Sequence, residues 1–215
     1  MIKKTIGPLT FVLVIVAAGV WIYRSQSDGS MKFDLEPYNA LGAGAAEETA
    51  KLLGNKGQVV VIAPDTSESR NPAVEGELSS FQKTLKKSGM TIVSTMRFKL
   101  TPMESMALGG AVPGDRFLKE LQSHPNVGAV ILFCAFPSLS PQDYDALRQS
   151  GTKFIVASGY LPSYRNLLDA KLIHVAIVPK FDSSFTPAKE PKTLRDWFEK
   201  EFTVITPANT ATLPY

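Results

Sequence analysis

The sequence predicts a doubly wound, Rossmann-like α/β fold, in which helices cover both faces of a mainly parallel sheet. Four short runs consist almost entirely of apolar and β-branched residues, which is typical of strands that have no solvent-facing side. Amphipathic segments, several of them closed by glycine, separate these runs and predict helices. The four apolar runs are residues 58–63, 127–135, 153–157 and 173–178.

The other elements follow from local signals along the chain. The predicted helices are 43–53, 72–88, 113–123, 141–150, 162–170 and 192–200, and two further strands are 90–98 and 202–205. Gly54, Gly89 and Gly151 follow three of these helices as stop signals, and Ser140 is a suitable N-cap for another. We therefore divide the chain into an anchor (1–24), a linker with a short helix (25–56), the α/β domain (57–206) and a tail (207–215).

The beginning of the chain predicts one transmembrane helix. Residues 5–23 are 19 consecutive uncharged residues, long enough at about 1.5 Å per residue to cross a hydrocarbon core of about 30 Å. The residues expected in lipid or at its interface are Leu9, Phe11, Leu13, Ile15, Trp21 and Tyr23. Lysines before the span favour a cytoplasmic N-terminus, with the α/β domain in the periplasm of a bacterial inner membrane. The alternative is a cleaved signal peptide, with Ala17 and Gly19 near the cut.

Composition narrows the chemistry that the protein can perform. The chain has one cysteine and two histidines, so we expect no internal disulfide, no metal site and no cofactor. Residues 1–30 contribute +2 of the formal net charge of +3, from Lys3, Lys4 and Arg24 against Asp28. The α/β domain is therefore close to neutral, which argues against nucleic acid as a partner.

The predicted carboxyl ends of the strands, where ligands bind in this architecture, hold no recognisable catalytic set. Residues 63–72 are polar but match neither the dinucleotide-binding fingerprint nor a Walker loop. Asp65 in this stretch is suited to a sugar hydroxyl or an ammonium group, or alternatively to an Asx-turn at the strand end. Ser158 lies outside a nucleophile elbow, and Cys134 lies inside an apolar run. We therefore predict that the protein is not an enzyme.

The stretch 101–114 is rich in glycine and proline and is long for a connection between two elements. It carries Met103, Met106 and Leu108, apolar side chains that so short a segment cannot bury by itself. Two interpretations stay open: a docking loop for another protein, or a lid over the domain's own core.

The run 59–65 (VVVIAPD), followed by Asn71 and Pro72 and by 74–93, resembles the opening of the type I periplasmic-binding-protein fold. Sugar-binding proteins and lactose-repressor-type regulators share this fold. The stretches 115–121, 127–132 and 151–158 continue the resemblance, which covers residues 57 to 182. It implies a solute-binding site at Asp65, Asn71, Phe136 and Ser158.

Two departures from that family shape the functional prediction. The chain has the length of one lobe where the family closes two lobes on a ligand, and Ala73 and Val74 stand where an aromatic pair is expected. We predict a non-enzymatic, single-pass accessory subunit that packs in the lipid bilayer with the subunits of a larger membrane complex, for example respiratory or photosynthetic. The alternative is a membrane-anchored solute-binding or sensing domain of the periplasmic-binding-protein type, which dimerises to complete its cleft around a small molecule.

Overall fold

A computed structural model describes residues 34–158, 164–180 and 190–212, together with residue 18. A six-stranded sheet in the order β2-β1-β3-β4-β5-β6 forms the centre of the unit from Leu35 onward. The strands are β1 (Gln58–Pro64), β2 (Thr91–Phe98), β3 (Ala129–Leu132), β4 (Lys153–Ala157), β5 (Val175–Pro179) and β6 (Phe202–Ile205). The first five strands run parallel and β6 runs antiparallel to β5. The predicted α/β class with a mainly parallel sheet is confirmed.

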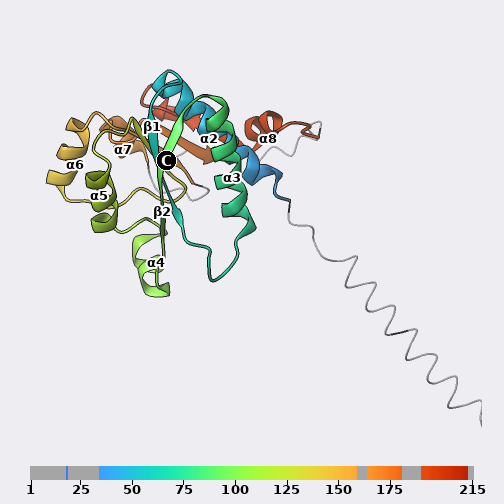
Figure 1. Ribbon diagram of the computed structural model, residues 1–215, viewed down its shortest axis with the longest axis horizontal. Coiled ribbons are helices and arrows are strands. Elements are labelled where there is room, and N and C mark those ends of the chain that lie inside the picture. Colours follow the sequence, from blue (N-terminus) through green and yellow to red (C-terminus); the bar gives the residue numbers. More distant parts are fainter. Residues whose placement is uncertain (1–17, 19–33, 159–163, 181–189, 213–215) are drawn as a thin grey trace, which may run out of the picture. The chain divides into compact units, whose positions relative to one another are not determined.

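Helices cover the two faces of this sheet (Figure 1). One face carries α2 (Glu36–Leu53), α3 (Pro72–Lys87) and α8 (Leu194–Glu201), and the other carries α5 (Gly114–Ser123), α6 (Pro141–Gln149) and α7 (Arg165–Asp169). A short helix, α4 (Pro102–Leu108), follows β2, and a 3-10 turn (Thr210–Thr212) follows β6.

Alternate side chains of each central strand enter two separate hydrophobic cores. In β1, Val60 and Ile62 pack in the core beneath α5, α6 and α7, whereas Val59 and Val61 pack beneath α2 and α3. Both faces of the strand are buried, which explains why its sequence is continuously apolar rather than alternating.

Helix α2 is held against its neighbours by small side chains. Its buried residues are mainly alanine and glycine, and they bring the helix close to α3 and α8. A Cβ at Gly44 would lie only 2.1 Å from the ring of Phe198 in α8, so glycine is required for this approach. The sequence predicts a short helix over 43–53 ahead of the domain, whereas α2 begins seven residues earlier, at Glu36, and is part of the compact unit Leu35–Tyr215.

The stretch predicted as a long loop contains α4. The side-chain oxygen of Thr101 accepts a hydrogen bond from the backbone N–H of Glu104, and the Glu104 carboxylate accepts one from the Thr101 N–H. This capping box begins the helix, and Gly109 in a left-handed conformation ends it. Met103 and Met106 are 81% and 87% exposed, so these two side chains do not form a lid over the core.

The predicted membrane anchor, with Leu9, Phe11, Leu13, Ile15, Trp21 and Tyr23, lies outside the described residues. Within the part of the chain that the structure describes, no helix combines the length and the apolar character needed to cross a bilayer.

Candidate functional site

The loop that follows β1 begins with a fixed carboxylate, Asp65. The backbone N–H of Asp65 donates to the carbonyl of Phe98 at 2.7 Å, which ties the loop to the end of β2. One carboxylate oxygen of Asp65 accepts from the backbone N–H of Ser67 at 2.9 Å, and the other accepts from the Ser67 hydroxyl at 3.1 Å. These hydrogen bonds, led by the backbone bond of Ser67, hold the pKa of Asp65 below its ordinary value. Asp65 therefore forms the Asx-turn that the sequence analysis kept as an alternative, and it presents an ionised group at the strand end.

The same loop ends at Asn71, which caps α3. The side-chain oxygen of Asn71 accepts from the backbone N–H of Ala73 at 3.1 Å, and Pro72 occupies the first turn of the helix. This hydrogen bond satisfies one backbone donor of the helix start. Asn71 therefore acts in this structure as a capping residue at the margin of the loop.

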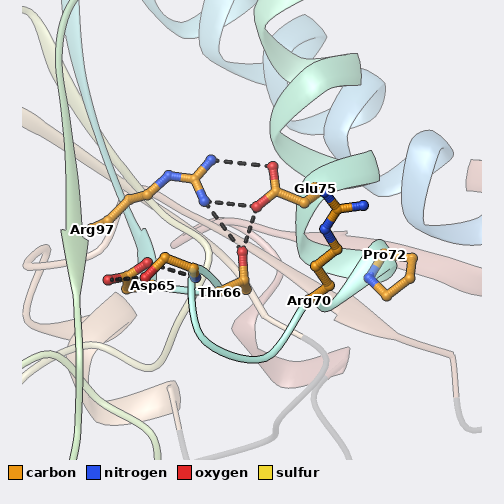
Figure 2. A pocket seen from close by; sticks show the side chains of 7 residues that line it. Asp65, Thr66, Arg70, Pro72, Glu75 and Arg97 are labelled. Atoms are coloured by element: carbon orange, nitrogen blue, oxygen red, sulfur yellow. Dashed lines mark hydrogen bonds and ion pairs between the residues drawn. The ribbon is translucent and has the colours of Figure 1, made fainter.

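Three polar side chains from different elements meet above the loop (Figure 2). Arg97, near the end of β2, donates from Nη1 to Oε1 of Glu75 at 2.7 Å and from Nη2 to Oε2 at 3.3 Å. The hydroxyl of Thr66 donates to Oε1 of Glu75 and accepts from Nη1 of Arg97 at 3.3 Å. The hydrogen bond from Arg97, assisted by that from Thr66, lowers the pKa of Glu75 to about 2. The carboxylate of Glu75 is therefore ionised at every physiological pH, and the network fixes the orientation of the guanidinium.

These groups line a pocket of about 670 Å³ at the carboxyl edge of β1 and β2. Its lining residues are Asp65, Thr66, Ser67, Arg70, Pro72, Glu75 and Arg97. A smaller hollow of about 330 Å³ adjoins it at Asp65 and reaches Lys99 and Ser105 of α4. In that hollow, Nζ of Lys99 lies 2.8 Å from Glu68 and 3.8 Å from Asp65.

Two of the predicted ligand residues lie apart from this pocket. Phe136 is only 7% exposed, and its ring makes edge contacts with Phe117 and Phe154 at centroid distances of 5.7 and 5.8 Å. Ser158 at the end of β4 is 8% exposed. Asp65 lines the pocket, Asn71 borders it through the cap of α3, and Phe136 and Ser158 belong to the interior.

Thr66, Arg70, Glu75 and Arg97 were not predicted as site residues, although all four line the pocket. Arg97 carries a signal that sequence reasoning could have used, because it lies at the carboxyl end of a predicted strand. Glu75 carries no such signal, since its position in the first turn of a helix is already explained by the helix dipole.

Two further observations concern the cysteine and the potential metal ligands of the described residues. Burial raises the pKa of Cys134 to about 12, so its thiol stays protonated. No group of three or more potential metal ligands occurs among the residues that the structure describes.

The doubly wound fold of this chain is similar to the type I periplasmic sugar-binding protein fold, as three solved structures show. An arabinose-binding protein from Geobacillus stearothermophilus aligns with 83% of this chain, at a TM-score of 0.57 and 17% identity. A solute-binding protein from Burkholderia graminis in complex with D-arabinose aligns with 82% (TM-score 0.56, 16% identity), as does one from Agrobacterium vitis bound with α-D-tagatopyranose (TM-score 0.52, 16% identity).

This chain spans about three fifths of the length of each of those proteins, with 63%, 62% and 58% of their chains covered. At such low identity the likeness concerns the fold, and the names of these proteins describe binding proteins rather than enzymes. No protein-family model matches the sequence, and no curated protein matches it.

Proposed function

We propose that the α/β domain binds a small polar solute in the pocket lined by Asp65, Arg70, Glu75 and Arg97. The observation that carries this proposal is the pocket itself, a space of about 670 Å³ bordered by fixed and ionised polar groups. Ligand pockets commonly have volumes of about 300–1,000 Å³ and use a small number of oriented polar groups for specificity.

The pocket offers both hydrogen-bond acceptors and donors to a solute. The Asp65 carboxylate has lone pairs beyond the two that Ser67 occupies, and Arg97 keeps N–H groups beyond those that bind Glu75 and Thr66. Because these side chains are held by other protein groups, little rotamer entropy is lost when a solute binds. This arrangement suits a molecule rich in hydroxyl or similar groups.

A single lobe covers such a solute from one side only. Affinity depends on burying most of the ligand, so a second surface is required for tight binding. We propose that a second copy of the chain supplies this surface, as in a solute-sensing domain that dimerises around its ligand.

Replacing Asp65 with asparagine is expected to weaken solute binding at least tenfold. The asparagine oxygen can still accept from the Ser67 N–H and keep the turn, but the negative charge that strengthens hydrogen bonds from the solute is lost. Thermal-shift titration with a panel of sugars, sugar acids and amino acids measures this change. Asp145→Asn on the exposed surface of α6 is the matched control and should bind as the unmodified protein does. Absence of any shift across the panel would remove the proposal.

A second candidate function rests on the exposed methionines of α4. We propose, as this alternative, that the chain is a single-pass accessory subunit held in the membrane by residues 5–23, whose α4 contacts a larger membrane complex. Met103 and Met106 are the most exposed large apolar side chains of the described residues, and methionine adapts well to varied partners.

Replacing Met103 and Met106 together with serine is expected to release the protein from such a complex, because about 1 kcal/mol or more of apolar burial is lost at each position. Native gel migration of membranes in mild detergent measures the release. Val93→Ser on the edge strand β2, where the side chain is 36% exposed, is the control. Migration of the unmodified protein as a free monomer would exclude this second candidate.

A further inference from the structure

Some charged side chains around the pocket are fully paired with an opposite charge, and others are not. Arg97 is paired through both terminal nitrogens with Glu75, so this pair presents no net charge. Lys99 lies between Glu68 and Asp65 and is closer to Glu68, at 2.8 Å against 3.8 Å. Glu68 faces the adjoining hollow rather than the pocket. The pocket therefore keeps the negative charge of Asp65, matched only in part by Lys99.

Arg70 supplies the complementary positive charge. It lies in the loop just before Asn71 and Pro72 and lines the pocket, as Figure 2 shows. Among the described residues, none forms an ion pair or hydrogen bond with its guanidinium. Its planar fork of donors is therefore available, and this geometry matches the two oxygens of a carboxylate.

From this pairing of an available guanidinium with an available carboxylate we infer that the solute is a carboxylate that also carries hydrogen-bond donors. Arg70 binds its carboxylate group, and Asp65 accepts from its hydroxyl or ammonium group. Sugar acids and amino acids both have this chemistry. The inference rests on the proposed solute-binding function and adds the chemical class of the ligand.

The same charges disfavour two other classes of ligand, neutral sugars and phosphate dianions. A neutral sugar satisfies Asp65 but gives Arg70 no charged partner. A phosphate dianion brings two negative charges, of which Arg70 offsets one, toward the ionised carboxylate of Asp65, which repels the other. A ligand with a single negative charge, which Arg70 offsets, fits the pocket best.

The test compares matched ligands by titration calorimetry on the full chain in mild detergent. Galacturonate is set against galactose, which lacks the carboxylate, and serine is set against ethanolamine, which lacks it as well. We expect galacturonate to bind at least ten times more tightly than galactose, or serine at least ten times more tightly than ethanolamine. The pair that shows this difference identifies the ligand as a sugar acid or as an amino acid. Arg70→Gln is expected to lower the affinity for that carboxylate at least tenfold. Arg70→Lys is expected to lower it less, because lysine keeps the positive charge but lacks the planar fork of donors.

Lys87→Gln, at the opposite end of α3, makes the same change of charge away from the pocket and should have no effect. If galactose or ethanolamine binds as tightly as its acid and Arg70→Gln changes nothing, the inference is overturned while solute binding stands. If none of the four ligands binds and the wider panel gives no thermal shift, the proposed function fails together with the inference.

Discussion

Gly42→Ala is expected to lower the free energy of unfolding by about 3 kcal/mol or more. A Cβ at this position would lie 2.0 Å from the carbonyl oxygen and 2.8 Å from the carbonyl carbon of Glu77. Both atoms belong to the backbone of α3, so the overlap is relieved only by moving one helix away from the other. Close-packed interiors resist such shifts, and overpacking costs about 1–3 kcal/mol or more.

The direction of this effect is opposite to the helix propensity of the two residues. In an exposed helix, alanine is more favourable than glycine by about 1 kcal/mol. Urea denaturation of the two proteins measures the net change. A loss of unfolding free energy would therefore come from the packing of α2 on α3 and not from the helix propensity of the substituted residue.

Gly76→Ala in α3 is the matched control for this experiment. A Cβ at Gly76 would meet the side-chain oxygen of Asn39 at 2.9 Å, and a flexible side chain can turn aside. We expect a change within about 1 kcal/mol, because the gain in propensity offsets the displaced contact. Equal stability of Gly42→Ala and the unmodified protein would show that α2 and α3 do not approach as closely as described.

The four central strands β1, β3, β4 and β5 could be predicted because they are buried on both faces. A strand such as β4 (KFIVA) has no solvent side, so its apolar run shows in the sequence without any tertiary information, and its predicted bounds agree with the structure. The start of α2 could not be predicted in the same way. Gly42 and Gly44 weaken a helix in isolation, and only their contacts with α3 and α8 explain their presence.

The candidate site was predicted in part for a related reason. The fold class places the loop after the first strand at the binding edge, which brought Asp65 into the prediction, and the family resemblance added Asn71. The partnership of Glu75 with Arg97 spans two elements, and no local pattern indicates which side chains will meet there. The start of α4, by contrast, has a local signal that the predictions did not use, because Thr101 and Glu104 have the spacing of a capping box.

The second large effect concerns Glu77, in the same interface between α2 and α3. Burial raises the pKa of its carboxyl from 4.5 to about 8, because the charged form loses its hydration. The folded protein therefore holds a proton on Glu77 at pH values where the unfolded chain has released it. The stability associated with this proton is fully present below pH 4.5 and is lost as the pH rises toward 8.

We expect the free energy of unfolding to fall by about 2–4 kcal/mol over this pH range. A pKa shift is worth about 1.4 kcal/mol per unit, and the expected loss is smaller than the full shift implies because the side chain keeps partial access to water. Glu77→Gln removes the titration while keeping a similar shape. The variant is expected to exceed the unmodified protein in stability at pH 9 by that amount and to differ from it little at pH 4.5.

Urea denaturation of both proteins at the two pH values measures this difference, and the comparison of variant with unmodified protein removes the contribution of His174. That histidine acts in the opposite direction: burial lowers its pKa to about 4, so it makes the fold more stable as the pH rises from 4 toward 6.5. Glu68→Gln, whose side chain is 82% exposed, serves as the control and should leave the pH dependence of unfolding unchanged. If Glu77→Gln keeps the pH dependence of the unmodified protein, Glu77 is ionised in the folded state, and its carboxyl group is not shielded from water.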